Sequence, residues 1–159
     1  MKIRFGFWWL LVVMALSGCV TVERFHEGMY QSYYGKYPWL RPRVYQICVR
    51  EAGAHDLPVN LVLAVIDAES SGRTNAVSKA GALGLMQVMP QYWYKRGPAS
   101  DLHRPEIGIR VGCSVLAWAR NLAHGDPIYT LRNYERGPRG KGINWTYTHK
   151  ILRNMAKTQ

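Results

Sequence analysis

The chain has 159 residues, of which 48% are hydrophobic, and its formal net charge is +11. This length is enough for one compact domain and excludes a multidomain organisation. The charge predicts an anionic partner or surface. Because the basic residues are scattered rather than grouped in runs, an ordinary solvated surface is an equally good interpretation.

The first residues are typical of an export signal. Lys2 and Arg4 form a short basic start, and residues 5–16 carry no charge. Such a segment is too short for the roughly 20 apolar residues that cross a bilayer as a helix, and it matches the core of a signal peptide. We therefore expect residues 1–18 to be a signal peptide and the chain to be exported. Nucleic acid is then not an expected partner, whereas peptidoglycan with its peptide carboxylates, or anionic lipid headgroups, fits both compartment and charge.

The signal ends in a segment that resembles the lipobox of bacterial lipoproteins, because residues 16–19 read Leu-Ser-Gly-Cys. The resemblance implies that Cys19 is acylated, becomes the first residue of the mature chain and anchors the protein on a membrane. Val20 stands where an aspartate would retain such a lipoprotein in the inner membrane, which implies the outer membrane and its periplasmic face. The alternative is an ordinary signal peptide with a cysteine there by chance.

The rest of the chain predicts a lipidated tether followed by a helical domain. Residues 19–40 are rich in tyrosine and glycine without a clean period, which indicates a tether; the alternative is that their aromatic side chains pack against the domain. Residues 41–159 have helical patterns and form the predicted domain, so the expected fold class is mainly α. The expected helices run from about residue 43 to His55, from Pro58 to about Ser70, from Leu85 to Met89, from Pro105 to about Ala123, from Pro127 to just before Gly137, and from about Asn144 to Lys157. Residues 71–84 have the composition of a loop, in which a small hairpin is an option.

Two cysteines remain besides Cys19. Cys48 and Cys113 each lie on the apolar face of a predicted helix. An oxidising compartment allows a disulfide between them, and two buried free thiols are the alternative. The five histidines are dispersed without the spacing of metal ligands, and no glycine-rich phosphate loop occurs. We therefore expect neither a metal nor a cofactor.

Glu69 is the residue whose position calls for an explanation. Leu61, Val65 and Glu69 are four residues apart and share one face of a helix that is apolar nearly all round. Apolar surroundings and the negative end of the helix dipole both disfavour ionisation, so the pKa of this carboxyl group is expected to be raised. A carboxylic acid that is protonated near neutral pH can protonate the oxygen of a leaving group. The alternative is a glutamate exposed at a helix end. Asp67, two residues away, points elsewhere and is the less suitable candidate.

The sequence around Glu69 resembles the lytic transglycosylases of the SLT family. Residues 67–72 read Asp-Ala-Glu-Ser-Ser-Gly, residues 75–78 read Asn-Ala-Val-Ser, and residues 81–90 read Gly-Ala-Leu-Gly-Leu-Met-Gln-Val-Met-Pro. They contain the Glu-Ser and Gly-Leu-Met-Gln motifs of that family at the family's spacing. The resemblance extends from Val44 to Gly112 and implies a single domain with the goose-type-lysozyme-like fold.

The resemblance also implies an activity on peptidoglycan glycan strands. Glu69 would protonate the β-1,4 bond between N-acetylmuramic acid and N-acetylglucosamine. It would then act as a base on the muramoyl 6-hydroxyl, which attacks C1 and leaves a 1,6-anhydro end without using water. Ordinary glycosidases use two carboxylates. In this family the acetamido group of the substrate stabilises the cationic centre instead, and no cofactor takes part.

The same resemblance assigns the substrate-binding residues. They are Ser70, Ser78, Met86, Gln87, Tyr134 and Tyr147. Ser70 would support the geometry of Glu69, and Gln87 with the backbone around Met86 would line the groove and hold an N-acetyl group. The Met86 side chain is also expected to pack in the core. The hydroxyl of Tyr134 would face Glu69, and Tyr147 would line the groove.

A third motif departs from the family pattern. Residues 133–137 read Asn-Tyr-Glu-Arg-Gly where the family usually has Ala-Tyr-Asn, one further residue and Gly. Glu135 therefore replaces an asparagine. Either this is a surface change, with Glu135 paired to Arg132 or Arg136, or the second carboxylate alters substrate contacts or lets water compete as the nucleophile.

Two other functions stay open at this point. A hydrolytic muramidase on the same fold would use water, and a peptidoglycan-binding or assembly module would have lost its activity. Wall turnover, lysis, or wall opening for a secretion or conjugation apparatus would all use the same chemistry, so the sequence does not separate these roles.

Overall fold

The structure is a computed structural model that describes residues 28–156, and the chain divides into two compact units, residues 1–38 and Trp39–Gln159. The expected signal peptide and Cys19 lie outside the described residues. In the first unit, residues 28–36 are helical, where the sequence predicted no regular element. Tyr30 and Tyr34 lie one turn apart with their ring centroids separated by 5.7 Å. A side-chain pair at this spacing stabilises a helix.

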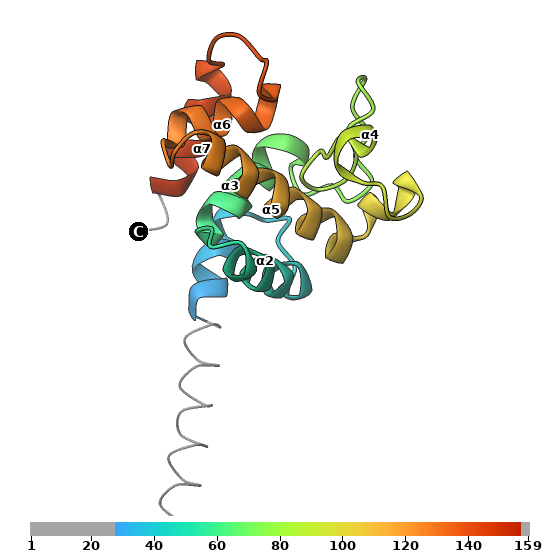
Figure 1. The fold of residues 1–159 in the computed structure, drawn as a ribbon. Helices are drawn as coiled ribbons and strands as arrows, with labels where there is room; N and C mark the ends of the chain where they lie inside the picture. Colours follow the sequence, from blue (N-terminus) through green and yellow to red (C-terminus); the bar gives the residue numbers. More distant parts are fainter. Residues whose placement is uncertain (1–27, 157–159) are drawn as a thin grey trace, which may run out of the picture. The chain divides into compact units, whose positions relative to one another are not determined.

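The second unit is mainly helical, as predicted (Figure 1). Its elements are α2 (Pro42–Ala54), α3 (Val59–Ser70), α4 (Pro90–Trp93), a 3-10 helix over Ala99–His103, α5 (Pro105–Leu122), α6 (Pro127–Arg136) and α7 (Trp145–Ala156). Among the described residues, β pairing is limited to isolated antiparallel bridges from Leu83 to Val77 and to Val88. No helix in the described part of the chain is both long and apolar enough to span a bilayer.

The core of the second unit lies around α3 and α5 (Figure 1). Helix α5 packs against α2 and α6, and α3 packs against α2 and α7. Residues 62–66 of α3 are buried without interruption, which explains why this helix is apolar nearly all round. The core also includes Ile109 and Leu116 on α5, Leu131 on α6 and Ile151 on α7, each at most 1% exposed. The ends of α3 and α7 are thereby fixed relative to each other.

Most helix boundaries follow the predicted start signals. Pro105 and Pro127 each open a helix as predicted, because a first-turn proline needs no amide donor, and Pro42 opens α2 in the same way. The side chain of Asp126 accepts a hydrogen bond of 2.9 Å from the backbone N–H of Tyr129, as expected of an N-cap. Pro58 precedes the first residue of α3 rather than occupying it.

The predicted helix from Leu85 to Met89 is wrong. The backbone groups of Leu83 and Val88 exchange hydrogen bonds of 2.9 and 3.0 Å, and residues 84–87 form the turn between them. Gly84 and Gln87 have φ angles of 74° and 47°, in the left-handed region that a right-handed helix excludes. The hairpin expected as an option within residues 71–84 therefore extends to Val88.

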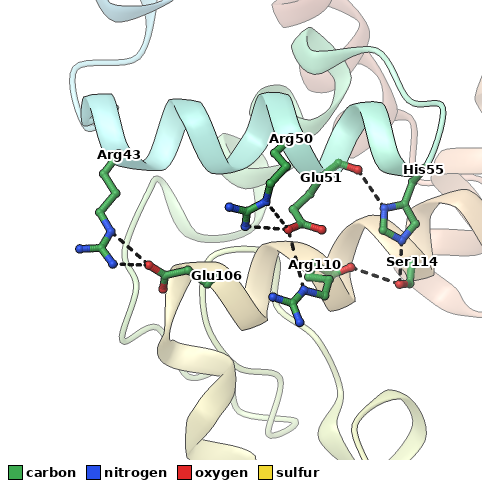
Figure 2. A network of polar contacts seen from close by, with 7 residues as sticks. All are labelled: Arg43, Arg50, Glu51, His55, Glu106, Arg110 and Ser114. Carbon is green, nitrogen blue, oxygen red and sulfur yellow. Dashed lines mark hydrogen bonds and ion pairs between the residues drawn. The ribbon is translucent and has the colours of Figure 1, made fainter.

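A polar network joins α2 to α5 on the surface of the second unit (Figure 2). Glu51 is 5% exposed, and its Oε1 lies 2.8 Å from Nη2 of Arg50 and 3.8 Å from Nε of Arg110. Two further contacts of this network join Arg43 to Glu106 and His55 to Ser114, at 2.6 and 3.1 Å. A buried carboxylate requires partners of this kind, so the network sets the register of α2 on α5.

Candidate active site

Glu69 lies in the last turn of α3, with its side chain half-buried. Helix α3 ends at Ser70, and the next residue, Ser71, has a φ of 52° in the left-handed region. The chain therefore leaves the helix direction two residues after Glu69. The hydroxyl of Tyr147, on α7, donates a hydrogen bond of 2.7 Å to Oε1 of Glu69. The packing of α3 against α7 thus brings together two polar side chains that are 78 positions apart.

The surroundings of Glu69 hold its carboxyl group near the midpoint of its titration at neutral pH. Burial raises the pKa of Glu69 from its ordinary value of 4.5 to about 7. The hydrogen bond from Tyr147 lowers this pKa, the negative charge of Glu135 raises it, and the ammonium of Lys150 lowers it. Such a group can give a proton to a leaving oxygen and then take one from a nucleophile. Burial and the charge of Glu69 raise the pKa of Tyr147 well above its ordinary value, so Tyr147 remains a neutral donor.

Ser70 fixes the end of α3 to the turn at residues 84–87. It is 1% exposed, and its hydroxyl donates hydrogen bonds to the backbone oxygens of Leu85, at 2.8 Å, and Ile66, at 3.2 Å. Because Ser70 follows Glu69 directly, this bond sets the position of the carboxylate relative to the turn. This placement fits the expected role of Ser70 in supporting the geometry of Glu69, and Ser70 is not among the residues that line the adjacent cleft.

In the turn at residues 84–87, the backbone of Gly84 lies close to the 3-10 helix over Ala99–His103. A Cβ atom on Gly84 would lie 2.1 Å from the backbone oxygen of Leu102, so only glycine fits there. The side-chain amide of Gln87 donates to the backbone oxygens of Gly84 and Ala76, at 3.0 and 3.3 Å. These bonds fix the side chain of Gln87, whose backbone is left-handed, in the wall of the cleft next to Glu69.

Met86 joins the core to the site. Its side chain is fully buried against Gly112 of α5, where an added Cβ would lie 2.4 Å from its sulfur. Its backbone oxygen accepts a hydrogen bond of 2.7 Å from the hydroxyl of Tyr134, on α6. The expected packing of the Met86 side chain in the core is confirmed, and the expected role of its backbone in holding an N-acetyl group stays a prediction.

These elements surround a cleft of about 250 Å³. Its lining residues are Glu69, Ser78, Ala80, Ala82, Gln87, Val88, Met89, Trp93, Val115, Tyr134 and Glu135. Ser78 is held in the wall because its hydroxyl accepts a hydrogen bond of 2.9 Å from the N–H of Ala82. The cleft therefore presents one acid of raised pKa, amide and hydroxyl groups, and an indole ring. This combination suits a ligand with both polar and apolar faces.

Glu135 shares the cleft with Glu69 and is also paired. Its Oε1 accepts a hydrogen bond of 2.7 Å from Nδ2 of Asn144, and its Oε2 lies 3.3 Å from Nε of Arg136. The side chain of Asn144 also accepts a bond of 3.2 Å from the N–H of Tyr147, at the start of α7. The pairing with Arg136 fits the first interpretation of Glu135, and its position in the cleft leaves the second, an effect on substrate contacts or on water, as a prediction.

The Transglycosylase SLT domain family matches residues 47–152, about two thirds of the chain. The chain belongs to this family. Among its curated relatives are the proteins called endo-type membrane-bound lytic murein transglycosylase A from Salmonella paratyphi B and Salmonella enteritidis, each 29% identical over 132 residues. These alignments cover 76% of this chain and 62% of each relative.

Solved structures of lytic transglycosylases share the fold. The 70 kDa soluble lytic transglycosylase from Escherichia coli is 22% identical, with a TM-score of 0.57 over 77% of this chain and 20% of its own. An inactive mutant of the lytic transglycosylase Slt from Pseudomonas aeruginosa is 21% identical, with a TM-score of 0.54 over 72% of this chain and 22% of its own. The predicted lysozyme-like fold is confirmed.

The structure brings most of the expected site residues together. It differs from the expectation in the partners of the hydroxyl groups of Tyr134 and Tyr147. The resemblance assigned to Tyr134 the hydroxyl that faces Glu69, whereas the structure gives this hydrogen bond to Tyr147. The hydroxyl of Tyr134 instead donates a hydrogen bond to the backbone oxygen of Met86. The pKa of Tyr134 is raised mainly by burial and also by the nearby charge of Glu69. The difference follows from α7, which packs on α3 and so reaches the end of that helix.

Asp67 lies away from the cleft, as expected. It accepts hydrogen bonds from the indole N–H of Trp39, at 3.1 Å, and from Nδ2 of Asn154, at 3.2 Å. The ammonium of Lys150 lies 3.7 Å from Oδ2 of Asp67. Asp67 therefore links α3 to α7 through its contacts with Asn154 and Lys150, and it does not line the cleft.

The two remaining cysteines are free and buried in the structure. Burial raises the pKa of both thiols, that of Cys113 to about 12, which makes them unreactive. Of the two alternatives, the structure has the buried free thiols rather than the disulfide.

Sequence reasoning did not assign several residues of the site, among them Ala80, Ala82, Val88 and Met89 of the cleft wall. Trp93 and Val115 line the cleft, and Asn144 links Glu135 to the start of α7. No motif identified Trp93 or Val115, because their place depends on how α4 and α5 pack. Asn144 carried a signal, since asparagine before a helix is a common N-cap.

Proposed function

We propose that the chain is a peptidoglycan lytic transglycosylase with Glu69 as its single catalytic acid and base. The observation that carries the proposal is the half-buried carboxyl group of Glu69, bonded to Tyr147 at 2.7 Å in a cleft, with a pKa of about 7. Membership of the SLT family supports the assignment. The chain spans 62% of the length of the curated relatives it matches, which are named as murein transglycosylases.

The proposed reaction uses one carboxyl group twice, first as an acid and then as a base. Protonated Glu69 donates to the oxygen of the MurNAc–GlcNAc β-1,4 bond, and the bond from C1 to that oxygen breaks. The carboxylate then takes the proton of the muramoyl 6-hydroxyl as this oxygen bonds to C1, which restores the acid and closes a 1,6-anhydro ring. The Tyr147 hydroxyl stabilises the carboxylate between the two steps, because a hydrogen bond to the charged form favours it.

The walls of the cleft provide groups for the sugars. Ser78 and Gln87 offer hydrogen bonds for an N-acetyl group, while Trp93 offers a flat apolar surface for a sugar ring. Tyr134 orders this wall through its bond to Met86. The proposal needs no metal or cofactor for the reaction.

The proposal includes location. Lipidation of Cys19 would hold the enzyme on the periplasmic face of a membrane, and Val20 favours the outer membrane. The name of the Salmonella relatives includes the word membrane-bound, which supports attachment to a membrane. Service to a lysis, secretion or conjugation apparatus remains compatible with the same chemistry.

Hydrolysis by a muramidase is the second candidate function. The observation that favours it is Glu135, a second carboxylate that lines the same cleft as Glu69. Paired carboxylates let an enzyme activate water as the nucleophile. The bonds from Asn144 and Arg136 occupy both oxygens of Glu135, which favours the transglycosylase reaction.

Digestion of purified sacculi distinguishes these functions. The soluble chain from Val20 onward is compared with Glu69→Gln, and the released muropeptides are identified by mass spectrometry. Products lighter by one water, from the unmodified enzyme alone, are expected. Reducing ends would favour the muramidase, and the absence of cleavage by either protein would favour a peptidoglycan-binding module.

A further inference from the structure

A second pocket of about 370 Å³ adjoins the active-site cleft. It is lined by Trp93, Tyr94, Arg96, Ile107, Arg110, Val111, Ser114 and Val115. Its volume is within the roughly 300–1,000 Å³ that is typical of ligand sites. Trp93 and Val115 line both this pocket and the cleft around Glu69. The two spaces therefore meet at these side chains.

One face of α5 connects the pocket to the cleft. Residues 107, 110, 111, 114 and 115 recur at helical spacing and so share a face. At a rise of 1.5 Å per residue, Arg110 lies about 7.5 Å along the helix axis from Val115, towards the start of α5. The pocket therefore extends along α5 from the wall that it shares with the cleft.

The pocket is positively charged. Arg96 makes no hydrogen bond or ion pair with any of the residues described. Arg110 lies 3.8 Å from Glu51, whose Oε1 is already bonded to Arg50 at 2.8 Å, and 58% of the Arg110 side chain is exposed. Figure 2 shows Arg110 at this position on α5. Two further acidic groups lie close in sequence to the lining residues, and both are paired: Asp101 accepts a hydrogen bond from the hydroxyl of Tyr94, and Glu106 is paired with Arg43.

We propose that this second pocket binds a carboxylate of the peptide stem on the muramoyl residue of the substrate. The inference rests on the proposed function, which places a muramoyl sugar in the cleft. That sugar carries a stem with free carboxylates, so a ligand in the cleft brings an anion to the wall shared by the two spaces. Arginine binds carboxylates through two parallel hydrogen bonds, and Arg96 has its donors available. Ile107 and Val111 supply an apolar wall for the aliphatic part of the stem.

Binding to matched glycan strands tests the inference without requiring cleavage. The full chain carrying Glu69→Gln is titrated by calorimetry with peptidoglycan strands that keep their tetrapeptide stems, and with strands whose stems an amidase has removed. We expect about tenfold tighter binding to strands with stems, since a charge-assisted hydrogen bond contributes this much. Adding Arg96→Gln, or Arg110→Gln, should abolish most of that preference and leave binding to stem-free strands unchanged.

Two further variants make the result specific. Arg96→Lys keeps the charge without the bidentate geometry and should retain part of the preference. Arg43→Gln is the matched control, because it removes an equal charge from a side chain that is 82% exposed and paired with Glu106 outside the pocket. Equal binding to both kinds of strand, or an equal loss on both in Arg96→Gln, would overturn the inference. Cleavage of stem-free strands by the unmodified enzyme reports separately on the proposed function.

Discussion

The hydroxyl of Tyr147 donates a 2.7 Å hydrogen bond to Oε1 of Glu69, and these two residues come from the first turn of α7 and the last turn of α3. The bond favours the charged form of Glu69, whereas burial, the largest effect, and the charge of Glu135 favour the neutral form. The pKa of about 7 is the balance of these opposing effects, so changes at different residues should move it in opposite directions.

Tyr147→Phe should raise the pKa of Glu69 further, because it removes a donor to the carboxylate. The basic limb of the pH–rate profile should then move to higher pH, and kcat at the optimum should fall by about 10- to 100-fold through the loss of a charge-assisted bond. Initial rates on sacculi between pH 5 and 9 would measure both effects. A fall in kcat with the basic limb in place would show that Tyr147 does not act on the titration of Glu69.

Glu135→Gln should have the opposite effect on the titration. Removing the negative charge of Glu135 lowers the pKa of Glu69, so the basic limb should move to lower pH. The glutamine oxygen still accepts from Asn144, which keeps the start of α7 in place. The same rate measurements apply, and a shift to higher pH would contradict the assigned role. Loss of reducing-end products, if the enzyme forms any, would identify Glu135 as the residue that admits water.

Glu69→Gln should stabilise the folded protein in a pH-dependent way. The native carboxyl group, with a pKa of about 7, keeps a proton that the unfolded chain loses near 4.5. Stability therefore falls as the pH rises between these values, by at most about 3 kcal/mol. The glutamine abolishes this titration while still accepting from Tyr147. Urea unfolding should show the variant to be more stable at pH 8 and similar to the original at pH 4, and an equal difference at both pH values would contradict this account.

Ser70→Ala should reduce both stability and activity. It leaves the backbone oxygen of Leu85 without a buried donor, at a cost of about 1–3 kcal/mol, and releases the end of α3 from the turn. Ser71→Ala is the matched control, because the hydroxyl of Ser71 is exposed and its contact with Asp67 measures 3.4 Å. Denaturant midpoints and rates on sacculi would be compared. Equal effects of the two substitutions would show that the Leu85 bond is unimportant.

Gly112→Ala should destabilise the protein and impair the site. The new Cβ would meet the side chain of Met86 at 2.4–2.9 Å, and overpacking of this kind costs about 1–3 kcal/mol. Gly53→Ala, in α2, is the control, since an added Cβ there meets nothing within 4 Å and should stabilise the helix by about 0.5–1 kcal/mol. Thermal unfolding should show a lower midpoint temperature for Gly112→Ala and a higher one for Gly53→Ala than for the original protein. Similar midpoints for both variants would mean that the turn moves aside without cost.

The amino-acid sequence by itself determined the helices that position the site. Helices α2, α3, α5, α6 and α7 were predicted within a few residues, because their apolar spacing and proline starts are local signals. Glu69 was also identifiable from the sequence, because the apolar helix that carries it and the motifs beside it are patterns of residues close to it in the chain. The turn at residues 84–87 was mistaken for a helix because its pairing of Leu83 with Val88 and the left-handed Gln87 leave no helical or strand period.

Only the tertiary structure decided which side chains meet Glu69. The choice of Tyr147 over Tyr134 as its donor depends on the packing of α7 against α3, and the link from Glu135 to Asn144 depends on where α6 ends beside α7. The pocket with Arg96 and Arg110 likewise exists only once the segment after α4 lies along α5. A hydrogen bond requires atoms within about 3 Å, and side-chain order along the chain does not fix such distances between helices.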